Sequence, residues 1–144
     1  MTAIENLWED HDLPVADALH YADGRSCDVT LDPTAPSGFS VLSPFDLGEM
    51  LEDDPSRVSS VDGRAVVDLG EKGVLWGGEG SYGSEGFLAR LTADHKLIWA
   101  MFFTESNPFL RIQVSGNVAT FSSTTGVRVV VDIDDPRTPT LPER

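Results

Sequence analysis

The chain has little basic character and a single cysteine. Its 144 residues hold 24 acidic residues against 10 lysines and arginines, a formal net charge of −14. Proteins that bind nucleic acid directly neutralise its phosphates with clustered basic side chains, so this balance argues against DNA or RNA as a direct ligand. Anionic membrane surfaces are disfavoured for the same electrostatic reason. Cys27 has no second cysteine to form a disulfide with, which fits a reducing compartment.

Long apolar segments are also missing. The longest apolar run, Leu97 to Phe103, has seven residues, whereas a membrane-spanning helix needs about 18 to 20. The N-terminal residues are acidic and lack the basic and apolar regions of a signal peptide. We therefore predict a cytoplasmic protein that does not bind membranes.

Motifs for catalysis and for metal or cofactor binding are weak. The three histidines, His11, His20 and His95, are scattered, with no second His or Cys at the spacing of zinc ligands. The segment Gly78–Gly83 matches the pattern G-x-G-x-x-G. A dinucleotide fold requires a helix after that pattern, but residues 84–94 alternate like a strand. We accordingly predict no enzyme activity, no metal and no cofactor.

The second half of the chain is typical of short strands separated by turns. Apolar and polar residues alternate, and Gly-, Asn- and Asp-rich turns follow at short, regular intervals, as in an antiparallel meander. Leu97–Phe103 is apolar on both faces, so we place it at the centre of the sheet with elements packed on each side. The predicted strands are Arg64–Leu69, Val74–Trp76, Gly86–Leu91, Leu97–Phe103, Phe109–Val114, Val118–Ser123 and Val127–Ile133.

The first half predicts short helices and one strand. Residues 3–22 are predicted to be irregular or briefly helical: residues 3–8 can form a turn, and Pro14 can occupy the first position of a second helix. Residues 27–31 alternate with the period of a half-buried strand. Ser43 and the proline after it predict the start of a further helix, which ends at Asp54-Pro55.

Together these patterns predict an α+β fold: an antiparallel sheet meander of about five to seven strands with short N-terminal helices packed on it. One domain is the default at this length, and the chain is long enough to bury a core without disulfides or metals. We assign this domain to residues 1–134. The proline-rich tail, residues 135–144, is expected to be frayed.

The negative charge is concentrated in the first half of the chain. Residues 1–72 hold 16 acidic and 4 basic residues, a net charge of −12, whereas residues 73–144 carry a net charge of −2. One acidic group lies between Glu5 and Asp23 and a second between Asp46 and Asp54. Such an uneven distribution favours a surface that masks a basic partner, because opposed potentials speed encounter and suppress wrong partners.

The acidic stretches Glu5–Asp23 and Asp46–Asp54, with the strand-rich segment that ends in Leu97–Phe103, predict acidic helices over a sheet. In this layout, in size and in acidity, the chain resembles the immunity proteins of bacterial toxin systems. The resemblance implies a protein that binds a cognate toxin domain, often a basic nuclease, and blocks its active site. We expect Trp8 and Tyr82 to be apolar anchors of such a contact. The acidic residues expected to face the toxin are Glu9, Asp10, Asp12, Asp17, Glu49, Glu52, Asp53 and Asp54.

The glycine-rich segment Gly77–Gly86 supports a second hypothesis. Its glycines are typical of a mobile connection between strands, flanked by Trp76 and carrying Tyr82. Such a connection can form the lip of a pocket. The alternative function is then that of a small accessory domain that binds a ligand.

Overall fold

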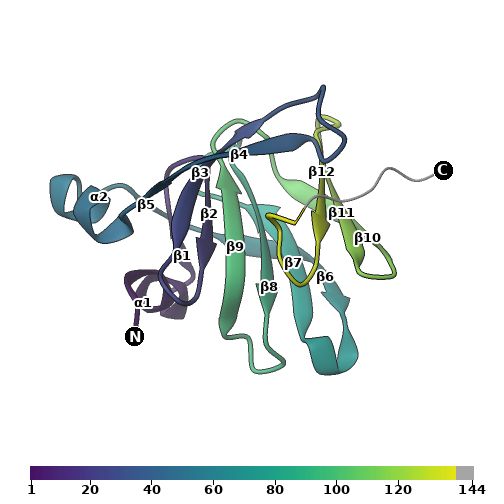
Figure 1. The fold of residues 1–144 in the computed structure, drawn as a ribbon, viewed down its shortest axis with the longest axis horizontal. Coiled ribbons are helices and arrows are strands. Elements are labelled where there is room, and N and C mark those ends of the chain that lie inside the picture. The colour runs from purple at the N-terminus through teal and green to yellow at the C-terminus, as the bar shows by residue number, and fades with distance from the viewer. Residues whose placement is uncertain (139–144) are drawn as a thin grey trace.

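Antiparallel strands dominate the computed structural model, which describes residues 1–138 (Figure 1). The largest sheet has seven strands in the order β4-β3-β2-β9-β8-β7-β6. Across the sheet these are Phe39–Phe45 (β4), Ser26–Leu31 (β3), Ala18–Tyr21 (β2), Leu97–Phe103 (β9), Gly86–Leu91 (β8), Val74–Glu79 (β7) and Asp62–Asp68 (β6). The predicted α+β class, with short helices and an antiparallel sheet, is confirmed.

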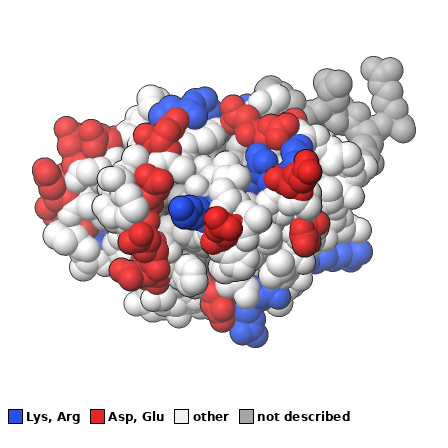
Figure 2. Space-filling model, turned by 90° about the horizontal axis from the view of Figure 1, so that it is seen from below, with Lys and Arg blue, Asp and Glu red and all other residues white. Residues whose placement is uncertain are grey.

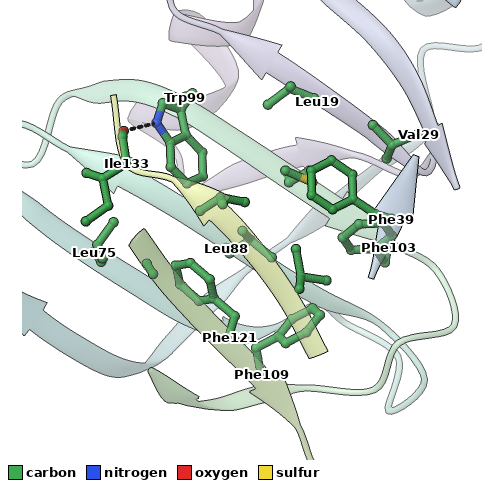
Figure 3. Close-up of a cluster of buried hydrophobic side chains, with 14 of the residues drawn as sticks. Leu19, Val29, Phe39, Leu75, Leu88, Trp99, Phe103, Phe109, Phe121 and Ile133 are labelled. Carbon is green, nitrogen blue, oxygen red and sulfur yellow. Dashed lines mark hydrogen bonds between the residues drawn. The ribbon is translucent and has the colours of Figure 1, made fainter. Parts of the chain in front are cut away.

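A second sheet packs on one face of the large sheet. It is antiparallel and three-stranded, in the order β10-β11-β12. Its strands are Phe109–Ser115 (β10), Val118–Ser123 (β11) and Arg128–Asp132 (β12). Side chains of the two sheets point toward one another in Figure 3, where Phe109 and Phe121 lie opposite Leu88 and Trp99. This interface is the larger hydrophobic core.

The N-terminal helices cover the opposite face of the large sheet. They are Ala3–Glu9 (α1) and Leu47–Asp53 (α2), accompanied by a two-stranded sheet of Asp12–Pro14 (β1) and Val58–Ser60 (β5). A short 3₁₀ helix, Gly70–Lys72 (η1), joins β6 to β7. The second core lies beneath this cover and contains Ile4, Trp8, Leu13, Leu47, Phe87, Ala89, Ala100 and Phe102.

Strand β9 occupies the middle of the seven-stranded sheet, as its sequence predicts. Its side chains alternate between two buried faces, because successive residues of a strand point in opposite directions. Trp99 and Phe103 enter the core shared with the three-stranded sheet, and Ala100 and Phe102 enter the core beneath the helices. Burial on both faces explains why the strand contains no polar residue.

Both helices are short, and a side chain caps each N-terminus. Thr2 Oγ1 accepts a hydrogen bond from the backbone N–H of Glu5, whose carboxylate accepts one from the backbone N–H of Thr2, so α1 begins with a capping box. Asp46 caps α2 by accepting from the backbone N–H of Glu49. Among residues 1–138, no helix has the length and apolar character needed to cross a membrane.

The predicted helix start at Ser43 is wrong, because that residue lies in β4. The proline that follows, Pro44, also lies in β4 and pairs with Cys27. An edge strand tolerates proline, since it does not need every backbone N–H for pairing, and β4 is the edge of the sheet. The helix begins four residues later at Leu47, with Asp46 as its cap, and ends at Asp53 as expected.

The helix predicted to begin at Pro14 is also wrong. Pro14 ends β1, and Ala18–Tyr21 forms β2, which pairs with β3 and β9. All four residues of β2 are buried. A strand buried on both faces has no period-two alternation, so its apolar residues can equally fit a helical spacing.

The chain after β12 returns to the large sheet. The Tyr21 hydroxyl donates a hydrogen bond to the carboxylate of Asp135, and the Arg137 guanidinium lies 5.1 Å from the centroid of the Tyr21 ring. Pro136, between them, is buried. The first residues of the predicted tail therefore pack against β2, and residues 139–144 lie outside the described part of the chain.

Candidate protein-binding surface

The cover formed by α1, β1, α2 and β5, residues 3–14 and 46–60, is strongly acidic and is called the acidic layer below. It contains nine acidic residues and one basic residue, Arg57. Within residues 1–138, none of these acids forms a salt bridge with a lysine or arginine. Figure 2 shows acidic side chains gathered at the left end of the molecule, the end that α2 occupies in Figure 1.

The layer on the opposite face of the large sheet has more basic than acidic residues. The three-stranded sheet, residues 109–132, carries Arg111 and Arg128 and one acid, Asp132. Acidic residues therefore predominate in one outer layer of the fold and basic residues in the other. In the sequence, this separation appeared only as a difference in net charge between the two halves of the chain.

The amphipathic pattern of α2 directs its acids outward. Leu47, Met50 and Leu51 pack on the core beneath the helix. The acids of the opposite face, Glu49, Glu52 and Asp53, are exposed. Asp54 follows the helix and is also exposed, and its carboxylate accepts hydrogen bonds from the backbone N–H and hydroxyl of Ser56 at 3.2 and 2.6 Å.

The acids of α1 and β1 form the second part of the layer. Glu9 and Asp10 are exposed at the end of α1. Asp12 is half-buried on β1 and accepts a hydrogen bond from the Ser60 hydroxyl at 3.3 Å. The hydrogen bonds that Glu5 accepts from the Thr2 backbone and hydroxyl lower the pKa of its carboxyl group, so this acid is tied to the helix cap.

Asp17 differs from the other predicted contact residues. It is half-buried outside the acidic layer, and its carboxylate accepts hydrogen bonds from the backbone N–H and the hydroxyl of Thr104 at 2.7 and 2.9 Å. These bonds join the segment before β2 to the end of β9. We therefore assign Asp17 a structural role and leave it out of the candidate surface.

An aromatic cluster lies beside the acidic layer, consisting of Trp76, His11 and His95. The ring centroid of Trp76 is 5.7 Å from that of His11 and 5.1 Å from that of His95, both in edge-to-face contact. The histidines are exposed and the tryptophan is partly buried. Both histidines have positive φ, 54° for His11 and 65° for His95, so each ring projects from a turn in the left-handed conformation.

Trp8 is not the exposed anchor that its sequence position predicts. The side chain is 4% exposed and packs on Phe87 in the core beneath α1. Its indole N–H donates to the His95 carbonyl at 3.0 Å. Trp76 lies above Trp8, with ring centroids 5.8 Å apart, and takes the surface position instead.

Sequence reasoning missed this cluster because its members come from three distant segments. His11 follows α1, Trp76 lies on β7, and His95 lies in the turn between β8 and β9. The only local signal is a tryptophan followed by Gly77-Gly78, and that pattern is equally compatible with a core position.

Gly78, the first glycine of the G-x-G-x-x-G pattern, and Gly77 before it serve packing between strands. Gly77 and Gly78 lie in β7, where a Cβ would come within 2.9 Å of the Phe109 carbonyl oxygen and 2.0 Å of the Asp62 carbonyl oxygen, respectively. The residues after the pattern form strand β8. Glycine here permits close approach of neighbouring backbones.

The loop between β7 and β8 is fastened to β5, in contrast to the mobile connection that its glycines predict. Glu85 is 3% exposed, and its carboxylate accepts hydrogen bonds from the backbone N–H of Tyr82 and the hydroxyl of Ser59, each at 3.2 Å. The backbone N–H of Ser81 donates to the same hydroxyl at 2.9 Å. Tyr82 is 71% exposed, and no residue of the predicted lip, 77–86, lines any of four cavities found on residues 1–138.

Replacing Glu85 by alanine is expected to lower the free energy of unfolding by about 1 to 3 kcal/mol, because the buried Ser59 hydroxyl and the backbone N–H of Tyr82 lose their acceptor. Chemical denaturation measures this loss, and hydrogen exchange should show faster exchange at the amides of Ser81 and Tyr82. The control Glu71→Ala, at an exposed acid, should change stability by less than about 0.5 kcal/mol. Equal effects of the two variants would contradict the role assigned to Glu85.

The chain matches no protein-family model, no curated protein and no solved structure in the comparisons made. Within residues 1–138, no three His, Cys, Asp or Glu side chains converge in a way that could hold a metal ion. The argument for function therefore depends on the charge, exposure and contacts of the acidic layer and the aromatic cluster.

Proposed function

We propose that this chain binds a basic protein domain through the acidic layer and neutralises it, in the manner of an immunity protein that blocks its cognate toxin. The proposed role is binding, without catalysis. The observation that carries the proposal is the presence of nine acids against one arginine in a single layer, none of them in a salt bridge within residues 1–138. Carboxylates that form no salt bridge within residues 1–138 retain their attraction for a basic partner.

The way the layer is held supports this proposal. The buried side chains of Ile4, Trp8 and Leu47 anchor the two helices to the large sheet. The acids therefore keep a defined arrangement before a partner arrives, which reduces the entropy lost on binding. The basic residues of the opposite layer favour an approach of the partner from the acidic side.

The proposed contact surface retains most of the residues that the sequence suggested. Trp8 and Asp17 are left out because one is buried and the other is bonded to Thr104. Tyr82 stays as an exposed aromatic residue beside β5. The acids of the surface are Glu9, Asp10, Asp12, Glu49, Glu52, Asp53 and Asp54.

The first test is co-expression of this chain with the C-terminal domain encoded by the adjacent upstream gene, with growth of the host as the readout. If that domain stops growth, this chain should restore growth and form a complex with it that weakens as salt is added. A harmless neighbour, or one that this chain does not bind, would contradict the proposal.

Charge reversal identifies the surface that binds. The triple variant Glu49→Lys, Glu52→Lys and Asp53→Lys should slow association with the toxin domain at least about tenfold at low salt and flatten its salt dependence, because electrostatic steering acts mainly on the association rate. Stopped-flow or surface plasmon resonance measures this rate. Asp54 is left unchanged because its carboxylate accepts hydrogen bonds from the backbone N–H and the hydroxyl of Ser56.

The matched control reverses three exposed acids outside the acidic layer, Asp28, Glu71 and Glu105. This variant has the same net charge as the first. It should retain an association rate within about threefold of the unmodified protein, since the surface near the partner is unchanged. Equal slowing in both variants would mean that net charge alone matters and that the acidic layer is not the binding surface.

A further inference from the structure

The central ring of the aromatic cluster has an unused hydrogen-bond donor. The other two tryptophans, Trp8 and Trp99, each donate their indole N–H to a backbone carbonyl 3.0 Å away. Trp76 makes no such bond with any residue that the structure describes. Its nitrogen is not enclosed either, because the single buried side-chain nitrogen or oxygen without a partner in residues 1–138 is His20 Nε2. The Trp76 nitrogen is therefore not among the fully buried atoms of the described residues.

Two further rings contact this indole, and acidic residues adjoin both of them in the chain. His11 and His95 each contact it edge-to-face and are themselves exposed. Asp10 and Asp12 flank the first histidine in the chain, and the exposed Asp94 precedes the second. Within residues 1–138, none of these three carboxylates forms a salt bridge. The site thus combines aromatic rings with carboxylates that form no salt bridge within residues 1–138.

This combination matches the chemistry of a guanidinium group. A guanidinium is planar, stacks on aromatic rings and can donate two parallel hydrogen bonds to one carboxylate. An ammonium group is a compact, strongly hydrated charge and gains less from the rings. Tryptophan and arginine are also the residues that most often dominate the energy of protein interfaces.

We infer that the aromatic cluster of Trp76, His11 and His95 is where this chain holds an arginine side chain of its protein partner, against the rings and beside the carboxylates of Asp10, Asp12 and Asp94. The inference rests on the proposed function, because it takes the partner to be a basic protein. It adds a preference for arginine over lysine at one position, whereas the acidic layer as a whole attracts either residue.

Two synthetic peptides of equal charge, hexa-arginine and hexalysine, test this preference by titration calorimetry at low salt. The unmodified protein should bind hexa-arginine at least about threefold more tightly, the scale of a cation–π contact at a partly exposed site. Trp76→Leu should remove the preference and leave the affinity for hexalysine unchanged. The control Leu110→Ala alters an exposed apolar residue on β10, outside the proposed contact surface, and should retain the preference.

A spectroscopic measurement keeps the inference testable if Trp76→Leu does not fold. In the unmodified protein, hexa-arginine should shift the indole N–H resonance of Trp76 in a ¹H–¹⁵N spectrum and leave those of Trp8 and Trp99 in place. Equal affinity for both peptides, or an arginine preference that persists in Trp76→Leu, would overturn the inference alone. If neither peptide bound, or if reversing Glu49, Glu52 and Asp53 did not weaken both, the proposed function would fail as well.

Discussion

Lowering the pH from 6.5 to 4 is expected to reduce the free energy of unfolding by about 3 kcal/mol through His20 alone. The side chain is fully buried, its Nδ1 lies 2.8 Å from the Ser26 hydroxyl oxygen, and its Nε2 has no partner among the described residues. Burial lowers the pKa of His20 from 6.5 to about 4, because the charged imidazolium would lose its hydration.

The sign of this pH effect follows from the number of protons that His20 binds in the folded and in the unfolded chain. Above pH 6.5, His20 is neutral in both the folded and the unfolded chain, so its contribution to stability is complete. As the pH falls from there to about 4, the unfolded chain takes up a proton that the folded chain excludes, and stability decreases. About 2 kcal/mol should already be lost at pH 5.

Urea denaturation between pH 7 and pH 4.5 measures this effect, with His20→Gln as the comparison. The free energy of unfolding of His20→Gln will differ from that of the unmodified protein, but it should lack the part of the pH dependence that His20 causes. Because the His20 side chain contacts Ser26 of β3 and Phe45 of β4, local opening at pH 5 should appear first in the exchange of amides in β2 and β3. An identical slope in both proteins would show that His20 is not the group responsible.

Replacing Trp99 by alanine is expected to lower the free energy of unfolding by about 4 kcal/mol, a large share of the stability of a chain of this size. The side chain is completely buried at the middle of the central strand. Its indole N–H donates to the Ile133 carbonyl oxygen at 3.0 Å, beyond the end of β12, as the dashed line in Figure 3 shows. The residue therefore joins the two sheets by packing and by a hydrogen bond.

Trp99→Phe separates these two contributions. It keeps an aromatic ring in the core but loses the donor, so we expect a loss of about 1 to 3 kcal/mol, including the cost of the smaller ring. Leu110→Ala, at a side chain that is 47% exposed on β10, serves as the control and should cost less than about 1 kcal/mol. Calorimetric unfolding of the three variants gives the comparison. A loss for Trp99→Ala no larger than that for the control would contradict this assignment.

The strands of the second half could be predicted because local signals agree there. Alternation, glycine-rich turns and an apolar central strand all indicate the same arrangement, and β8, β9 and β11 have the predicted bounds. The segment around β2 failed because a strand buried on both faces carries no alternation. Strand β4 failed because Ser43 and Pro44 resemble a helix start when the pairing partner, β3, is not known.

The exposed acids of α2 were also predictable, since an amphipathic helix of seven residues has few ways to bury its leucines. The aromatic cluster was not, because it depends on which turn of the sheet reaches the end of α1. Trp8 and Trp76 illustrate this limit: both are tryptophans near acidic residues in the sequence, and only the three-dimensional contact decides which one covers the other.

The order of strands in the large sheet determines when this protein can fold during synthesis. Strand β2, near the N-terminus, has β9 as one of its two neighbours, and Ala18 pairs with Phe102. Contacts between residues so distant in sequence form slowly and only after both have left the ribosome. The N-terminal segments that carry most of the negative charge therefore emerge early but gain their supporting sheet late. During that interval the negative charge of these segments opposes association between unfinished copies of the chain, since like charges repel.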